Sequence, residues 1–109
     1  MKIIIDIDGT ICTEENYDNR KNARPFKKAI KNINIFKKKG YKIILYSSRP
    51  WSQYDLTIKW LKKNKLRFDN LILGKPIGDI WIDDRSMTPY NWNLISEKIK
   101  NILKVKKTL

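Results

Sequence analysis

The strongest constraint on the fold is the apolar run near the start of the chain, residues 2–7 (KIIIDI). Its β-branched residues follow one another without the alternation of a strand that has one face in water. The run therefore predicts a strand of a parallel sheet, buried on both faces. Asp6 and Asp8 fall at its end, where two carboxylates are unexpected in a buried segment.

Strand-like and helix-like segments alternate along the rest of the chain. Residues 25–40 place apolar side chains at helical spacing and end at a glycine, and residues 41–47 (YKIILYS) form a second predicted strand. Ser52 and Asp55 resemble a capping box that opens a helix over 53–65. The other predicted elements are a strand in FDNLIL (68–73), a strand in DIWID (79–83) and an amphipathic helix over 91–106.

This order predicts an α/β fold: a three-layer, Rossmann-like arrangement with a small, mainly parallel sheet and helices on both faces. The length of 109 residues suits a single domain over 1–109, and the polar segment 11–24 is expected to be a loop, too short for a cap domain. In such sheets the ligand lies beyond the carboxyl ends of the strands. The residues that follow each strand are therefore the candidates for function.

Composition excludes several classes of site. The chain has no histidine, so proton transfer at neutral pH falls to carboxylates, Lys or Tyr. The single cysteine, Cys12, rules out an internal disulfide and is expected to be a small buried residue. No apolar run is long enough to span a bilayer, and the N-terminus is unlike a signal peptide. These features predict a soluble, cytoplasmic protein without a membrane partner.

The formal net charge of +13 allows binding of nucleic acid or of anionic substrates. Lys, Asn and Ile dominate the composition, which is typical of AT-rich coding sequences, and only five of the 24 basic residues are Arg. Because Arg is the residue suited to bidentate recognition of phosphate, the charge does not by itself predict a specific nucleic-acid partner.

Four carboxylates are expected to meet at the carboxyl edge of the sheet. Asp6 and Asp8 follow the first strand, and Asp83 and Asp84 follow the strand predicted in 79–83. Each pair repels by roughly 4 kcal/mol at about 4 Å and an effective dielectric constant of about 20, so a cation is expected among them. An all-oxygen ligand set favours a hard ion, and Mg²⁺ is usually held by one or two carboxylates with waters and substrate phosphate.

Further polar residues follow the second and third predicted strands: Ser47, Ser48, Arg49, Gly74 and Lys75. The Ser47 hydroxyl can donate to a phosphoryl oxygen, and Lys75 can neutralise developing negative charge. With the carboxylates, they indicate a phosphoryl-transfer site for a small phosphorylated substrate. We expect Asp6 to attack phosphorus and form an aspartyl-phosphate, while Asp8 protonates the leaving oxygen and later activates water.

Four short motifs occur along the chain in this order: DIDGT (6–10), YSSR (46–49), GKP (74–76) and WIDDR (81–85). They resemble the four motifs of the haloacid dehalogenase (HAD) superfamily of Mg²⁺-dependent phosphatases, from residue 3 to about 85. The second Asp of the first motif implies a phosphatase. The spacing is also similar to small capless members associated with capsule or surface-polysaccharide biosynthesis. The leading hypothesis is a phosphatase of a small phosphorylated metabolite, for example a sugar phosphate.

The resemblance also implies roles for the matched residues. Asp6 is implied to be the nucleophile and a metal ligand, and Asp8 the general acid and base, with its carbonyl oxygen on Mg²⁺. Lys75 is implied to stabilise the intermediate, and Asp83 to hold the metal with Asp84 in support. The expected phosphate-binding set is Thr10, Ser47, Ser48 and Arg49.

Two features depart from many members of the superfamily. Only residues 76–78 separate Lys75 from Asp79, which is too few for a helical crossover, so the third strand is expected to be either short or unusually placed. Without a cap the site is open. An open site predicts a broad or bulky substrate, or a neighbouring copy of the chain that covers the site as a homo-oligomer.

Some assignments stay open at the level of sequence. Arg49 and Arg85 either guide substrate or form ion pairs with the acidic cluster, and Trp51 and Tyr90 either stack on a substrate ring or pack. The charge and the open site also fit a phosphatase of nucleotides or nucleic-acid ends. A receiver-like phosphoacceptor is disfavoured, because receivers place their acidic pair after the first strand and their lysine after the last.

Overall fold

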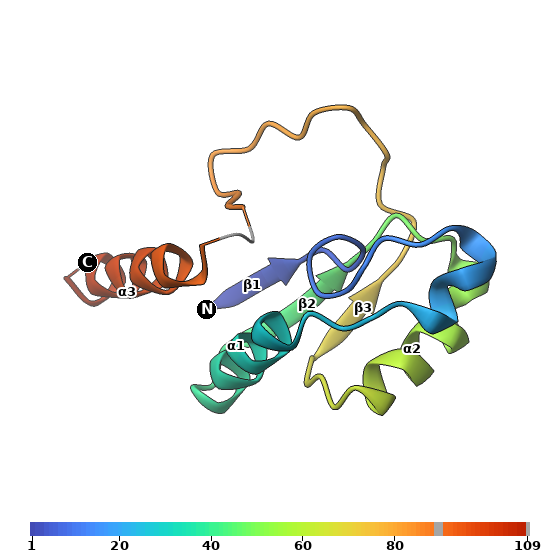
Figure 1. Ribbon diagram of the computed structural model, residues 1–109. Helices are drawn as coiled ribbons and strands as arrows, with labels where there is room; N and C mark the ends of the chain where they lie inside the picture. The colour runs from blue at the N-terminus through green and yellow to red at the C-terminus, as the bar shows by residue number, and fades with distance from the viewer. Residues whose placement is uncertain (89–90, 109) are drawn as a thin grey trace. The chain divides into compact units, whose positions relative to one another are not determined.

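The computed structural model describes residues 1–88 and 91–108, and the chain divides into two units, Met1–Gly78 and Asp79–Leu109 (Figure 1). Each unit is described by itself. The first unit contains three strands, β1 (Lys2–Ile5), β2 (Lys42–Tyr46) and β3 (Asn70–Ile72), and two α-helices, α1 (Lys27–Lys38) and α2 (Tyr54–Lys63). It also contains two short 3₁₀ helices, η1 (Tyr17–Asn22) and η2 (Trp51–Gln53). The second unit contains α3 (Trp92–Thr108).

The three strands form one parallel sheet in the order β1-β2-β3. Ile3 lies opposite Ile43, and Leu45 lies opposite Leu71. The predicted α/β fold with a small parallel sheet is confirmed. β3 is only three residues long, as the short connection after Lys75 predicts.

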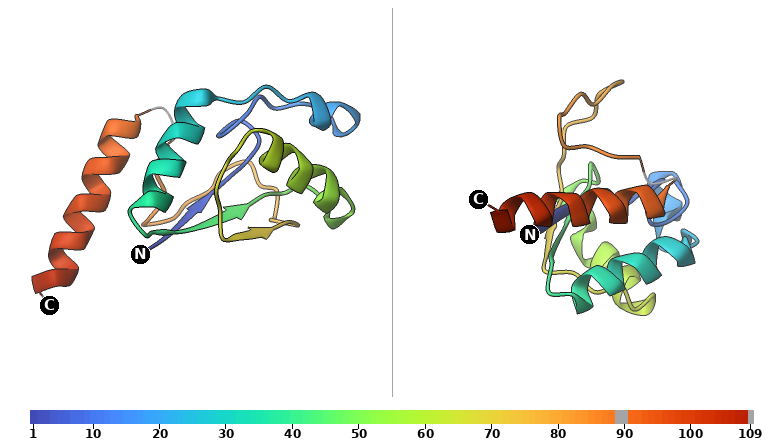
Figure 2. Two further views of the ribbon diagram at one scale, coloured as in Figure 1. Left: turned by 90° about the horizontal axis from the view of Figure 1, so that it is seen from below. Right: turned by 90° about the vertical axis from the view of Figure 1, so that its left-hand side faces the viewer.

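Helices α1 and α2 both cover the same face of the sheet (Figure 2). Successive strands are added in one direction across the sheet, so crossovers of the same hand place both helices on one side. This face carries the buried core of the unit, which includes Ile5, Ile43, Leu45 and Leu71. On the opposite face Ile4 is 64% exposed, so β1 is not buried on both sides as its sequence predicts. A helix on that second face stays a prediction.

Segment 11–24 is largely a loop, as predicted, but it includes η1 and is hydrogen-bonded to η2 and α2. The Arg20 guanidinium donates to Oε1 of Gln53 at 2.7 Å, and Gln53 donates back to the carbonyl oxygen of Tyr17 at 3.0 Å. The indole N–H of buried Trp60 donates to the carbonyl oxygen of Ala23 at 2.8 Å. The loop that follows the first motif is therefore held in place.

The predicted capping box is wrong. Residues 51–53 form η2, and α2 begins at Tyr54 after Gln53, which provides no side-chain cap. The Ser52 hydroxyl instead lies 3.4 Å from the hydroxyl of Tyr17. The Ser52 side chain, which the local pattern predicts to cap α2, therefore makes a tertiary contact with η1 instead.

The strand predicted over 79–83 is also wrong, because these residues form no ladder in the described structure. A strand needs a neighbour to satisfy its backbone groups, and the described part of the second unit contains no other strand. Ile80 and Ile82 are accordingly 77% and 92% exposed. The closing helix, by contrast, is confirmed as α3. No helix in the described part of the chain is long and apolar enough to cross a membrane.

Candidate active site

Asp6 is the first residue after β1 and lies at the carboxyl edge of the sheet. Its carboxylate accepts a hydrogen bond from the Thr10 hydroxyl at 3.4 Å and lies 3.6 Å from the Lys75 ammonium nitrogen. The Asp6 side chain is 37% exposed. The first and third motifs therefore meet here, around a carboxylate that solvent can reach.

A tight turn brings Thr10 back towards Asp6. The backbone N–H groups of Thr10 and Ile11 both donate to the carbonyl oxygen of Ile7, at 3.1 and 2.9 Å. Gly9 adopts a φ of +79°, a conformation that side chains with a Cβ rarely take. The glycine of DIDGT is therefore required by the turn that places Thr10 beside Asp6.

Asp8 is held by a bidentate ion pair with Arg49. Arg49 Nη2 donates to Asp8 Oδ1 at 2.7 Å, and Arg49 Nε donates to Asp8 Oδ2 at 2.9 Å. The Asp8 side chain is 16% exposed, whereas that of Arg49 is completely buried. Of the two alternatives for Arg49, an ion pair with the acidic cluster is what the structure shows. Phosphate binding by Arg49 stays a prediction.

The second and third motifs are joined by backbone hydrogen bonds beyond the ends of β2 and β3. Ser47 N–H donates to the carbonyl oxygen of Ile72, Lys75 N–H donates to that of Ser47, and Gly74 N–H donates to that of Arg49, at 2.9 to 3.0 Å. These bonds fix the backbone at Lys75, whose ammonium nitrogen lies 5.6 Å from the ring centroid of Tyr46.

The predicted phosphate-binding hydroxyls differ in exposure. Ser48 is exposed, but Ser47 is fully buried, and its hydroxyl accepts a hydrogen bond from the backbone N–H of Arg49 at 3.1 Å. A role for either serine in binding phosphate stays a prediction. Trp51 is 56% exposed and stacks on Tyr54 with ring centroids 6.0 Å apart, whereas Tyr90 lies outside the described residues.

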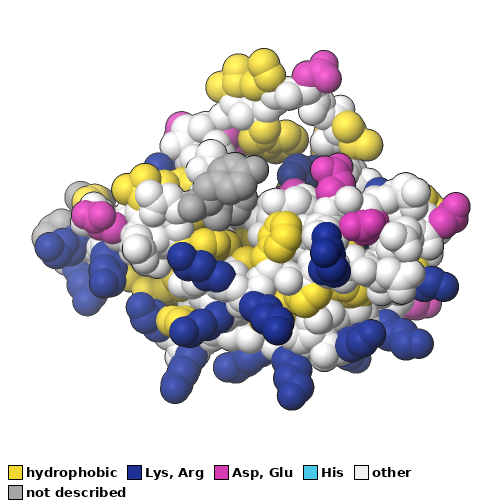
Figure 3. Space-filling model, viewed as in Figure 1, with side chains coloured by type: hydrophobic (Ala, Val, Ile, Leu, Met, Phe, Trp, Pro, Cys, Tyr) yellow, Lys and Arg dark blue, Asp and Glu magenta, His cyan; other side chains and the backbone are white. Residues whose placement is uncertain are grey.

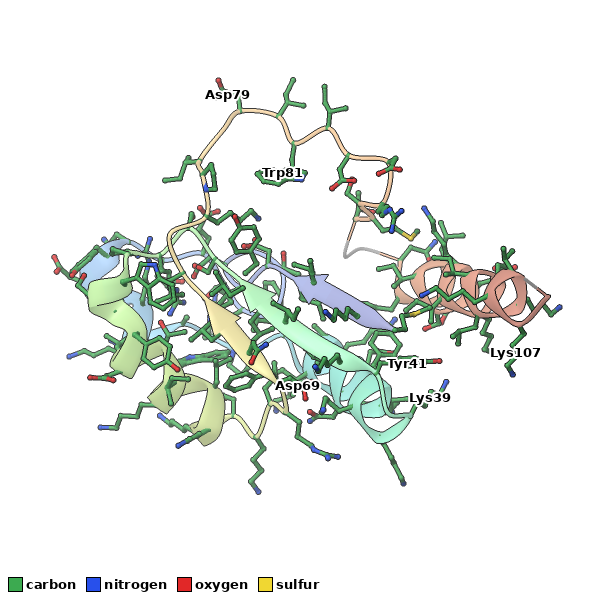
Figure 4. All side chains as sticks on the ribbon, turned by 180° about the vertical axis from the view of Figure 1, so that it is seen from behind. Lys39, Tyr41, Asp69, Asp79, Trp81 and Lys107 are labelled. Atoms are coloured by element: carbon green, nitrogen blue, oxygen red, sulfur yellow. The ribbon has the colours of Figure 1, made fainter. Side chains whose placement is uncertain are left out.

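Asp83 and Asp84 lie in the second unit, on the irregular segment that also carries Asp79 and Trp81 (Figure 4). The backbone N–H of Arg85 donates to Asp83 at 2.9 Å and, with a contribution from Asp84, lowers the pKa of the Asp83 carboxyl. Arg85 Nε lies 3.9 Å from Asp84, and both side chains are exposed. Arg85 thus pairs with its own motif, and metal binding by Asp83 and Asp84 stays a prediction.

The donors around Asp6 fit Mg²⁺ in chemical type. The Asp6 carboxylate and the Asp8 carbonyl are hard oxygen donors, and Mg²⁺ needs few protein ligands because it keeps several waters. Residues 1–88 and 91–108 contain no group of three or more acidic or sulfur side chains that could hold a metal ion. The residues of the first motif therefore suit part of a magnesium site and do not enclose one.

Cys12 is fully buried beside the first motif, as predicted. Burial, and then the neighbouring Asp8 carboxylate, raises the pKa of its thiol to about 12. The thiol is therefore protonated at neutral pH and is unsuited to nucleophilic chemistry.

Sequence reasoning missed one residue of the site, Thr57. Its side chain is fully buried, and its hydroxyl accepts a hydrogen bond from Arg49 Nη1 at 3.0 Å. Thr57 lies three and four residues before the buried Trp60 and Leu61, on the apolar side of α2. A polar residue on a buried helix face needs a partner, and that pattern could have indicated Thr57.

Three solved structures resemble this chain. A target protein from Vibrio cholerae is 23% identical with a TM-score of 0.73, over 92% of this chain and 97% of that one. A conserved protein from Bacteroides thetaiotaomicron is 26% identical with a TM-score of 0.64, over 93% and 90%. A chain of the Pnkp1/Rnl/Hen1 complex is 25% identical with a TM-score of 0.61, over 76% of this chain but only 30% of that one.

A search of curated proteins gave no match. A family model described as PITM 1-3, LNS2 domain, matches residues 3–100, which is most of the chain. The family match agrees with the parallel sheet and with the structural neighbours in indicating a phosphatase-type HAD-like fold. This chain therefore belongs to the PITM 1-3 LNS2 domain family, within the HAD-like superfamily.

Proposed function

We propose that this chain is a Mg²⁺-dependent phosphatase that hydrolyses the phosphate monoester of a small metabolite, such as a sugar phosphate. The observation that carries the proposal is the surroundings of Asp6. A partly exposed carboxylate at the end of β1 lies 3.6 Å from the Lys75 ammonium and two residues from a second, firmly held carboxylate, Asp8. Membership of the HAD-like superfamily supports the same reaction class.

In the first step an Asp6 oxygen attacks phosphorus, the bond from phosphorus to the leaving oxygen breaks, and Asp8 gives that oxygen a proton. In the second step water attacks the phosphorus of the aspartyl-phosphate and Asp8 takes a proton from it. Inorganic phosphate then leaves and Asp6 is restored. Thr10 orients the Asp6 carboxylate, and Lys75 stabilises the negative charge that develops on the phosphoryl oxygens.

The metal would be held by the Asp6 carboxylate and the Asp8 carbonyl oxygen, with Asp83 and Asp84 as the further ligands that we propose. A bound Mg²⁺ would screen the phosphoryl charge from the attacking carboxylate. We also propose a cytoplasmic enzyme without a cap domain, in which a neighbouring copy of the chain can cover the open site.

Asp6→Asn tests this proposal most simply, because the amide keeps the shape of the side chain but is not a nucleophile. We expect the variant to lose turnover of a nitrophenyl phosphate in Mg²⁺, and EDTA to abolish turnover by the unmodified chain. Asp18→Asn, an exposed position on η1, is the matched control and should keep its rate. An active Asp6→Asn variant, or activity unaffected by EDTA, would overturn the proposal.

A second candidate is a phosphatase of nucleic-acid ends. It is favoured by the likeness to a chain of the Pnkp1/Rnl/Hen1 complex, described as an RNA repair complex. It is also favoured by the Lys and Arg side chains that gather over α1 and α2 (Figure 3). A phosphorylated oligonucleotide that is hydrolysed faster than a sugar phosphate, at a rate that falls steeply with salt, would favour this candidate. Indifference to salt would count against it.

A further inference from the structure

We propose that Arg49 and Thr57 together form a positioning device that fixes the Asp8 carboxylate for proton transfer, and that Arg49 does not bind the substrate. This inference rests on the proposed function, because the assigned role of Asp8 belongs to that reaction. Its basis is the set of hydrogen bonds that the Arg49 side chain makes inside the first unit.

Every nitrogen of the Arg49 guanidinium already donates to a protein oxygen. Nε and Nη2 donate to the two Asp8 oxygens at 2.9 and 2.7 Å, and Nη1 donates to the Thr57 hydroxyl at 3.0 Å. The side chain is fully buried. These bonds use three of the five guanidinium N–H groups, and the other two belong to a side chain with no exposed surface, so the geometry argues against substrate binding.

The planar guanidinium also fixes the plane of the Asp8 carboxylate. Two parallel N–H bonds to one carboxylate restrict its rotation far more than a single bond or a point charge does. Thr57 prevents the guanidinium itself from rotating, and Thr57 is held in turn by the packed α2. The chain of contacts runs from a rigid helix to the carboxylate that transfers the proton.

The ion pair leaves the carboxylate able to act. A carboxylate has about four lone-pair positions on its two oxygens, and Arg49 occupies one on each. The Cys12 thiol also donates to Oδ1, at 4.0 Å. With 16% of the Asp8 side chain exposed, the remaining position on Oδ2 can face a leaving group or a water molecule. Arg49 also offsets the repulsion between the charges of Asp8 and Asp6.

The test compares two substrates that differ in how much they need a proton. A nitrophenyl phosphate has a stable leaving group that needs little protonation, whereas an alkyl phosphate cannot leave without it. The variants are Arg49→Lys, which keeps the charge but loses the planar fork, and Thr57→Val, which removes only the hydroxyl from a residue of the same shape. Arg67→Lys, at an exposed position, is the matched control.

For Arg49→Lys we expect kcat on the alkyl phosphate to fall by about 10- to 100-fold, within the usual contribution of general acid catalysis. KM should stay within about twofold for both substrates, since the phosphate contacts are intact. The first turnover of the nitrophenyl phosphate, which forms the aspartyl-phosphate, should be nearly unchanged. Thr57→Val should show the same pattern with a smaller loss and should fold, which keeps the test decisive if Arg49→Lys does not.

The possible results separate the two proposals. An unmodified chain without Asp6-dependent turnover overturns the proposed function and the positioning role with it. An active chain whose Arg49→Lys and Thr57→Val variants lose the same factor in the first turnover of both substrates, or lose nothing on either, overturns the positioning role alone. A rise in KM and weaker inhibition by inorganic phosphate in Arg49→Lys would instead make Arg49 a phosphate-binding residue.

Discussion

Two ion pairs lie at opposite ends of the strands of the parallel sheet, one beyond the carboxyl ends and one at the amino ends, and they differ in burial and in geometry. At the carboxyl edge, Asp8 pairs with a fully buried Arg49 through two bonds of 2.7 and 2.9 Å. At the other edge Asp69, just before β3, pairs with Lys37 of α1 at 2.9 Å, and both side chains are partly exposed (Figure 4). Asp69 also accepts the backbone N–H of Ile43 at 2.7 Å.

These differences indicate that the Asp69–Lys37 pair supports the fold, whereas the Asp8–Arg49 pair belongs to the candidate site. The Asp69 pair ties α1 to the start of β2 and β3 in a place where water can replace either partner, so its loss should be tolerated. The Asp8 pair removes two charges from water, which is costly unless both partners remain. In return, the pair fixes the orientation of the Asp8 carboxylate beside Asp6.

The largest effect should come from removing one partner of the buried pair. Arg49→Met leaves the Asp8 charge without its partner and should lower the free energy of unfolding by about 3–5 kcal/mol, as for other broken buried pairs. Urea unfolding measures this loss, with Arg67→Met, a substitution at an exposed arginine, as the control. The double variant Asp8→Asn, Arg49→Met should recover part of the loss. A loss no greater than that of Arg67→Met would contradict a compact, buried pair.

An intermediate effect on stability is expected when a glycine at either end of the strands is replaced by alanine, and its size should differ between the two ends. Gly74 (φ +76°) lies at the carboxyl edge, where an added Cβ would come within 3.1 Å of Trp51, whereas Gly40 (φ +89°) precedes β2 and has open space. Gly40→Ala should cost only conformational strain, roughly 1–2 kcal/mol. Gly74→Ala should cost more and also reduce phosphatase activity, because it shifts the backbone beside Lys75. If Gly74→Ala and Gly40→Ala lowered thermal stability equally and Gly74→Ala kept full activity, the two ends of the strands would not differ as we propose.

The smallest effect should come from Asp69→Asn. The Ile43 backbone N–H, and then Lys37, lower the pKa of the Asp69 carboxyl. A lowered folded-state pKa stabilises the fold above the unfolded-state pKa, and this stabilisation disappears as the pH falls through the folded value. The unmodified chain should therefore be slightly more stable than Asp69→Asn near neutral pH, and the gap should close in acid. A gap that widens in acid would contradict the assignment.

The sequence predicted the site best where the position of a residue depends only on the end of its own strand. Strand ends were assigned from apolar runs, and parallel topology then implied that Asp6 and Lys75 meet, which the 3.6 Å separation confirms. Local patterns failed where a distant partner decides the outcome. Residues 79–83 have the composition of a strand but lack a neighbouring strand in the described part of their unit, and Ser52 contacts Tyr17 rather than capping α2.

The Arg49 side chain shows the same limit in the site itself. Its position in YSSR suggested contact with substrate, and the alternative of an ion pair could not be chosen without knowing that Thr57 and Asp8 close around it. Ser47 is likewise fully buried, although its place at the end of the predicted strand 41–47 suggested a hydroxyl that faces the ligand. The motifs predict which residue types lie beyond the carboxyl ends of the strands. Packing against α2, as between Arg49 and Thr57, determines which of these side chains are exposed.

The most direct test of the whole account is to trap the phosphorylated protein. Asp8→Asn should still form the aspartyl-phosphate from a nitrophenyl phosphate in Mg²⁺ but should hydrolyse it slowly, so acid quenching and mass spectrometry of peptides can locate the phosphoryl group. We predict one phosphoryl group on Asp6, absent when Asp6→Asn is added. Phosphate on any other residue, or turnover by the unmodified chain without a trapped intermediate in an Asp8→Asn variant that circular dichroism shows to be folded, would contradict this mechanism.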